Sequence, residues 1–126
     1  MIGEEAFSEC RNLEGVSIPE GVLAIRNNAF CSCTKLEKIN IPKSCLFLGS
    51  RALKNTAIET IELPSITSIF QSTFNGCTKL REIKFGDRVN SIGQQAFRGC
   101  NSLVEVNLPK NLTILEPYCF EECWNL

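Results

Sequence analysis

A pair of apolar residues separated by one polar residue recurs along the chain at intervals of about 23 residues. The five copies are Val16/Ile18, Ile39/Ile41, Ile61/Leu63, Ile83/Phe85 and Val106/Leu108. This alternation is typical of a strand that buries one face and exposes the other. A strand of about three residues is unstable alone, so each copy has to pair with the same segment of the next unit. The pattern therefore predicts short parallel strands stacked along one face of a coiled chain.

The other strong positions repeat in the same register. A small residue followed by a large one recurs at Ala6-Phe7, Ala29-Phe30, Ala52-Leu53, Thr73-Phe74, Ala96-Phe97 and Cys119-Phe120. Three residues after the large one comes Cys10, Cys33, Thr56, Cys77, Cys100 or Cys123. These segments lack strand alternation, so we predict short helical turns on the opposite side of the coil, with each Phe pointing inward.

Proline or glycine ends each predicted strand, and a second extended piece follows it. The strands are followed by Pro19, Pro42, Pro64, Gly86 and Pro109, and the later apolar pairs are Val22/Ile25, Cys45/Leu48, Ile66/Ile69, Val89/Ile92 and Leu112/Leu115. Proline removes a backbone donor and suits the end of a strand. The third unit is two residues short, with one residue lost between Leu53 and Ile58 and one between Pro64 and Ile66.

These positions together resemble the BspA-type leucine-rich repeat. The resemblance is carried by the segments 36–42, 89–93 and 96–100, and it extends over nearly the whole chain. It implies a right-handed solenoid used for adhesion or protein binding, often on cell surfaces of bacteria and some protozoa. Arg26, Phe70 and Glu116 replace a glycine of the repeat, which we interpret as local variation.

We therefore predict one domain over residues 1–126, of the α/β class and mostly β. The expected fold is a right-handed leucine-rich-repeat solenoid of about five and a half coils, with short parallel strands on one face and helical turns on the other. Both ends lack the atypical polar cap of a solenoid, so we expect a fragment of a longer array, or ends that stack on other copies.

Charge and composition narrow the function further. The chain has 13 Lys and Arg against 14 Asp and Glu, and a formal net charge of −1. This balance gives no electrostatic drive toward nucleic acid. Apolar runs of a few residues argue against membrane insertion, and the first residues contain no secretory signal. We expect neither a nucleic-acid partner nor a membrane span.

The chain has eight cysteines and no histidine. The cysteine column could be a redox or metal ladder, but the threonine at position 56 favours small residues that fill the core, and we expect most thiols to be free. Cys45 and Cys119 replace core residues of the repeat, whereas Cys31 lies outside it and is the best candidate for an exposed thiol. Without histidine or a paired nucleophile and base, we predict no enzyme, no catalytic residue, no cofactor and no metal site.

Two phenylalanines do not belong to the inward column. Phe47 and Phe70 lie where most units carry polar or small residues. They indicate either an exposed contact patch or local repacking around the short third unit.

The outward positions of the predicted strands form the candidate binding surface. The partner-binding residues are Lys38, Asn40, Thr60, Glu62, Glu82, Lys84, Glu105 and Asn107, with Gly15 and Ser17 on the first strand. Glu14, Glu37 and Glu59 form an acidic column beside them. This face is either a solvated surface that keeps the strands soluble or a surface for a partner.

Two functions follow from these patterns. The first is a non-catalytic module that binds a protein or a glycan through the strand face, in a parent protein at the cell surface or outside the cell. The alternative is a structural spacer or self-assembling domain that stacks through its ends. The sequence does not identify the partner.

Overall fold

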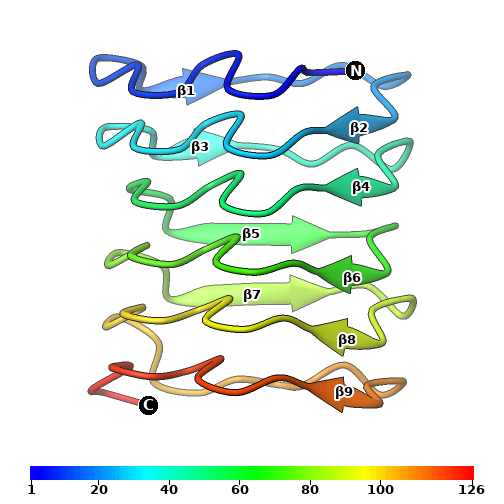
Figure 1. Cartoon of the computed structure of the whole chain (residues 1–126), viewed down its shortest axis with the longest axis vertical. Coiled ribbons are helices and arrows are strands. Elements are labelled where there is room, and N and C mark those ends of the chain that lie inside the picture. Colours follow the sequence, from blue (N-terminus) through cyan, green and yellow to red (C-terminus); the bar gives the residue numbers. More distant parts are fainter.

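The computed structural model describes residues 1–126 and shows a parallel β-solenoid with two columns of short strands (Figure 1). The first column contains β1 (Gly15–Val16), β3 (Lys38–Ile39), β5 (Thr60–Leu63) and β7 (Glu82–Phe85). The second contains β2 (Ala24–Ile25), β4 (Phe47–Leu48), β6 (Ser68–Ile69), β8 (Ser91–Ile92) and β9 (Ile114–Leu115). We call the outward sides of these columns the first and the second strand face. The termini lie at opposite ends of the stack.

Parallel pairing holds equivalent residues of neighbouring coils side by side. Gly15 pairs with Lys38 in β1–β3, and Thr60 pairs with Glu82 in β5–β7. In the second column β2 pairs with β4, and β6, β8 and β9 form one sheet. No pairing joins β3 to β5 or β4 to β6. Both breaks fall at the short third unit, which loses one residue before each of its strands.

The predicted fifth strand of the first column is not formed. Residues 104–108 make no backbone hydrogen bonds to β7. Leu108 is 47% exposed, although Ile18 and Leu63 in the equivalent positions are 3% and 0% exposed. An extended segment without a paired neighbour on either edge does not form a ladder.

The predicted helical turns are not confirmed, because the small–large segments form turns and the chain contains no helix. A left-handed residue stands two positions before and two positions after each large residue. These residues are Glu5, Glu9, Asn28, Ser32, Arg51, Asn55, Ser72, Gly76, Gln95, Gly99, Tyr118 and Glu122. The ten of them that are not glycine have φ between 57 and 63°. A left-handed residue at every fourth position ends any right-handed helix after one turn.

The left-handed residues direct alternate N–H groups toward the next coil. In the first turn the N–H of Phe7 donates to the carbonyl of Ala29 at 2.8 Å, while the N–H of Cys10 donates to Phe7 in its own coil at 3.1 Å. The same pattern recurs in the following turns, with three such bonds between each pair of neighbouring coils. We call this set of bonds the turn ladder. It continues through the short third unit, where Phe30 donates to Ala52 at 2.9 Å and Leu53 donates to Thr73 at 3.0 Å.

The core is built from the predicted inward columns. The rings of Phe7 and Phe30, and those of Phe74 and Phe97, stack nearly parallel with centroids 5.1 Å apart. Leu53 interrupts the stack between Phe30 and Phe74 and is fully buried. The inward residues of the second strand column are equally well buried. None is more than 2% exposed among Ile25, Leu48, Ile69 and Ile92. The predicted inward Phe column is therefore confirmed at Phe30, Phe74 and Phe97, which are fully buried, whereas Phe7 in the first coil is 38% exposed.

The turn ladder predicts how Arg51, an exposed residue with φ of 57°, tolerates substitution. Arg51→Val should lower the free energy of unfolding by about 1–2 kcal/mol, because a β-branched residue is strained in the left-handed region. Arg51→Gly should stay within about 0.5 kcal/mol of the wild type, because relief of strain offsets the larger entropy of the unfolded chain. Urea denaturation of both variants measures this difference. Equal stabilities would contradict a left-handed requirement at this position.

Candidate binding surface

The first strand face displays every outward residue that the sequence predicts. The exposed positions are Gly15, Ser17, Lys38, Asn40, Thr60, Glu62, Glu82, Lys84, Glu105 and Asn107. The residues that alternate with them along the chain, such as Ile18, Ile61 and Leu63, are buried. The alternation of the sequence therefore identified the solvent side of β1, β3, β5 and β7 correctly, whereas in residues 104–108 the predicted inward Leu108 is exposed as well.

Three of the predicted partner-binding residues, Asn40, Glu62 and Lys84, are engaged within the chain. The Asn40 amide accepts a hydrogen bond from the N–H of Ile18 and donates one to its carbonyl, both at 2.8 Å. It thereby extends the pairing of β1 and β3 by a side chain. Lys84 Nζ lies 3.1 Å from Glu62 Oε1 across β5–β7. This hydrogen bond, the charge of Glu62 and that of Glu82 raise the pKa of Lys84.

The predicted acidic column is partly neutralised by basic residues of later coils. Lys79 Nζ lies 3.8 Å from a Glu37 carboxylate oxygen, and an Arg81 guanidinium nitrogen lies 3.8 Å from Glu59. These pairs are exposed, so each contributes at most about 1 kcal/mol to stability. They do offset the repulsion between like charges stacked on neighbouring coils.

The exposed residues gather over two hollows on either side of the Glu62–Lys84 pair. One hollow, of about 400 Å³, lies over the break between β3 and β5 and is lined by Ser17, Lys38, Asn40 and Thr60 among others. The other, of about 190 Å³, is lined in part by Glu82, Lys84, Glu105 and Asn107. The structure thus divides the predicted surface into two polar depressions.

Comparison with known proteins identifies the repeat. The family described as the BspA type leucine rich repeat region matches residues 1–126 in 6 copies. The chain belongs to the BspA-type leucine-rich repeat family. Leucine-rich-repeat solenoids are in general structural or binding modules rather than enzymes.

Solved leucine-rich repeat proteins share this fold. The T. pallidum leucine-rich repeat protein is 30% identical, with a TM-score of 0.59, over 98% of this chain and 48% of that chain. A leucine-rich repeat protein from Eubacterium ventriosum is 25% identical, with a TM-score of 0.74, over 94% of this chain and 39% of that chain. The chain therefore spans less than half the length of these two proteins. No curated protein matches it.

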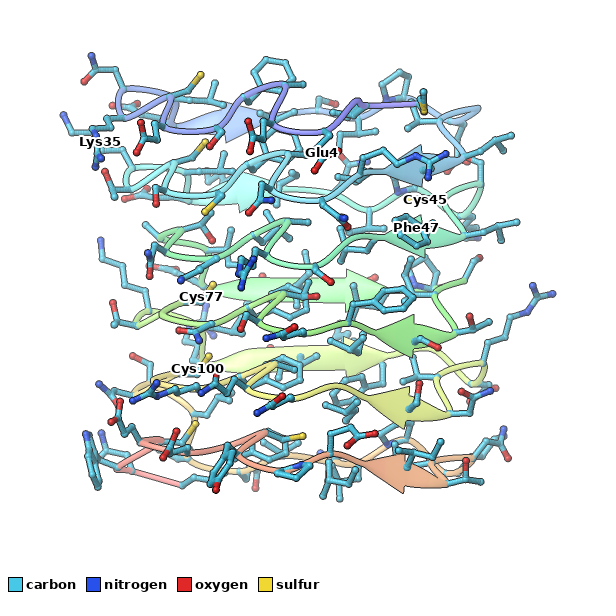
Figure 2. All side chains as sticks on the ribbon, viewed as in Figure 1. Glu4, Lys35, Cys45, Phe47, Cys77 and Cys100 are labelled. Atoms are coloured by element: carbon cyan, nitrogen blue, oxygen red, sulfur yellow. The ribbon has the colours of Figure 1, made fainter.

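Six of the eight cysteines of this BspA-type repeat are buried and donate to backbone carbonyls. All eight are free thiols. In the cysteine column, the Sγ of Cys33, Cys77 and Cys123 each lies 3.0 Å from the carbonyl of the large residue in the preceding coil. Figure 2 shows Cys77 and Cys100 in this column on neighbouring coils. At position 56 the column has a threonine in place of cysteine. Its hydroxyl donates to the carbonyl of Leu53 in its own coil at 3.0 Å. The cysteine column therefore fills the core, as the sequence predicts. Its thiols also donate hydrogen bonds to backbone carbonyls.

Burial determines the chemistry of these thiols. Desolvation raises the pKa of Cys77 to about 11, and it also raises the pKa of Cys100. The predicted exposed thiol was misplaced, because Cys31 is half-buried while Cys10 is exposed. Cys10 belongs to the same column and lies in the first coil of the stack.

The second strand face holds the two unassigned phenylalanines. Phe70 is 37% exposed, and its ring lies 5.2 Å from that of Phe47 between centroids. The Arg26 guanidinium carbon lies 5.6 Å from the Phe47 centroid, within the range of a cation–π contact. The two rings thus pack on one another, and Phe70 is also accessible. The exposed patch and the local repacking that the sequence suggests are therefore both found in part.

No cluster of three or more Cys, Asp or Glu side chains could hold a metal ion. The chain forms no helix that could cross a lipid bilayer.

The raised pKa of Cys77 predicts a loss of stability in alkali. Between pH 9 and 11 the unfolded chain loses a thiol proton that the folded chain keeps, so the free energy of unfolding should fall by about 1–3 kcal/mol from this group. Below pH 9 this contribution is fully present. Urea denaturation at several pH values tests it, with Cys77→Thr as the matched control, since threonine occupies this column at position 56. An unchanged slope in Cys77→Thr would contradict the assignment.

Proposed function

We propose that this chain is a non-catalytic recognition module for adhesion, which binds a protein or glycan partner through the first strand face. The contact residues are Lys38, Asn40, Thr60, Glu62, Glu82, Lys84, Glu105 and Asn107.

The family resemblance supports a parent protein at the cell surface or outside the cell. The spacing of the repeat supports about five and a half coils of right-handed sense.

One observation carries this proposal. Parallel pairing within β1–β3 and within β5–β7 holds exposed polar residues in register, and a hollow lies on each side of the paired strands β5 and β7, over β3 and Thr60 on one side and over residues 105–107 on the other. Because strand pairing fixes the backbone, the side chains are presented with little loss of freedom on binding. Acidic, basic and amide side chains alternate over a short distance. This favours a partner that carries both hydrogen-bond donors and acceptors.

A charge reversal tests the surface. The double variant Glu62→Lys/Glu82→Lys should weaken binding by at least about tenfold, because like charges placed opposite a partner's cations are repelled. Binding is measured on a glycan array and against a displayed peptide library, with the wild-type chain defining the ligands. The control is Glu4→Lys/Glu9→Lys, which makes the same charge change at two exposed residues of the first turn segment. Unchanged binding by the strand-face variant, or loss in the control alone, would contradict the proposal.

A second function, self-assembly through the ends, is favoured by the last coil. Leu115 is 50% exposed there, whereas Ile92 in the same column is fully buried. Leu108 is similarly uncovered. This apolar end is the surface on which another copy would stack. Light scattering over a range of concentrations should then show association, which Leu115→Glu abolishes. A wild-type chain that stays monomeric at every concentration would contradict assembly.

A further inference from the structure

On the second strand face, glycine alternates with larger residues along one column. From the first coil to the last, the column reads Gly3, Arg26, Gly49, Phe70, Gly93 and Glu116. A Cβ at Gly49 would lie 2.7 Å from the carbonyl carbon of Arg26, and one at Gly93 would lie 2.9 Å from that of Phe70. Both glycines are therefore required by the close approach of the preceding coil. Each leaves a gap between the side chains of its two neighbours.

The two inner gaps differ in what fills them. At Gly49, the ring of Phe47 occupies the space between Arg26 and Phe70, at 5.6 and 5.2 Å respectively. Figure 2 shows Phe47 on its strand, two residues before this glycine. Ser91 takes the corresponding place before Gly93. Its small side chain leaves an open hollow of about 360 Å³, within the usual range of small-molecule pockets.

Four kinds of group surround this hollow. Phe70 stands on one side along the column and Glu116 on the opposite side. Ser68 and Ser91 line a third side, and the Ser91 hydroxyl donates to that of Ser68 at 2.9 Å. Gln71 and Gln94 line the fourth side, and their side-chain amides make no hydrogen bond within the chain. The hollow thus combines an accessible aromatic ring and the exposed aliphatic side chain of Ile114 with two hydroxyls that bond to each other and two amides that make no bond within the chain.

The hydrogen-bond donors and acceptors of the hollow favour one class of ligand over another. Each amide offers donors and an acceptor, and each hydroxyl offers both. A ligand that satisfies them needs several groups that both donate and accept, together with an apolar side for Phe70. A pyranose ring has this composition, because its hydroxyls lie around the edge and its C–H groups lie on the faces.

A cationic side chain fits less well. A cation could pair with the Glu116 carboxylate and lie over the Phe70 ring. It offers no acceptor, however, to the side-chain N–H groups of the two glutamines. Glu116 is the single charged group of the lining and is exposed. One exposed ion pair contributes little to binding.

We propose that the hollow over Gly93 binds one pyranose ring of an uncharged glycan, with a C–H face against Phe70 and the hydroxyls toward Ser91, Gln94 and Glu116. This site is separate from the first strand face and does not depend on the proposed function of that face.

Saturation-transfer NMR with methyl glycosides of glucose, galactose, mannose and N-acetylglucosamine tests the site directly. A single ring has about a dozen heavy atoms, so a dissociation constant on the order of 1 mM is expected for the preferred glycoside. Phe70→Ala should reduce the transfer at least about fivefold. Ser91→Phe should abolish it, because the new ring fills this gap as Phe47 fills the other.

Two controls separate the possible causes of a loss. Ser17→Phe makes the same substitution on the first strand face and should leave transfer unchanged, as should Glu62→Lys/Glu82→Lys. The amide spectrum of Ser91→Phe shows whether the fold is kept, and Phe70→Ala supplies an independent variant. No transfer from any glycoside, equal transfer in Ser91→Phe and wild type, or binding of an arginine-containing tripeptide in place of all four glycosides would overturn the proposal.

Discussion

The turn ladder is the interaction on which the rest of the structure depends. The strand columns are interrupted at the short third unit, yet turn N–H groups donate to the next coil at every step along the chain. Left-handed residues make this possible by directing alternate N–H groups along the stack. Each coil is therefore held at a fixed height above its neighbour even where β3 and β5 do not pair. The stacked phenylalanines and the buried thiols fill the space behind the ladder.

Continuity on the turn side allows variation on the two strand faces. Because the ladder keeps the coils in register, the third unit can lose two residues without losing its place in the stack, and a polar hollow lies over β1, β3 and the first residue of β5. On the second strand face, alternating glycines let the coils approach and leave gaps that a side chain or a ligand can fill. The same rigid backbone thus presents two surfaces of different chemistry.

The sequence predicted what depends on the burial of side chains. The periods of Phe30, Phe74 and Phe97, and of the cysteine column, identified the core because apolar residues recur where the coil turns inward. The same alternation located Thr60, Glu62 and Glu82 on the exposed side of the strands.

Backbone conformation was less accessible from the sequence. The left-handed positions carry Glu, Asn, Arg, Ser, Gln and Tyr as well as Gly, so their identities gave no common signal for a turn instead of a helix. The hollow over Gly93 was missed because it depends on a glycine, on the small Ser91 and on Phe70 in the preceding coil. Its only trace in the sequence is the alternation of glycine with Arg26, Phe70 and Glu116, which was interpreted as local variation.

Native-state hydrogen exchange of the backbone amides tests the central role of the turn ladder most directly. The N–H groups of Phe30, Leu53 and Phe74 should be among the slowest to exchange, and the protection at Leu53 should equal that of its neighbours although the strands are broken at this coil. Fast exchange at these three amides, together with strong protection confined to β5 and β7, would show instead that the strands hold the coils together.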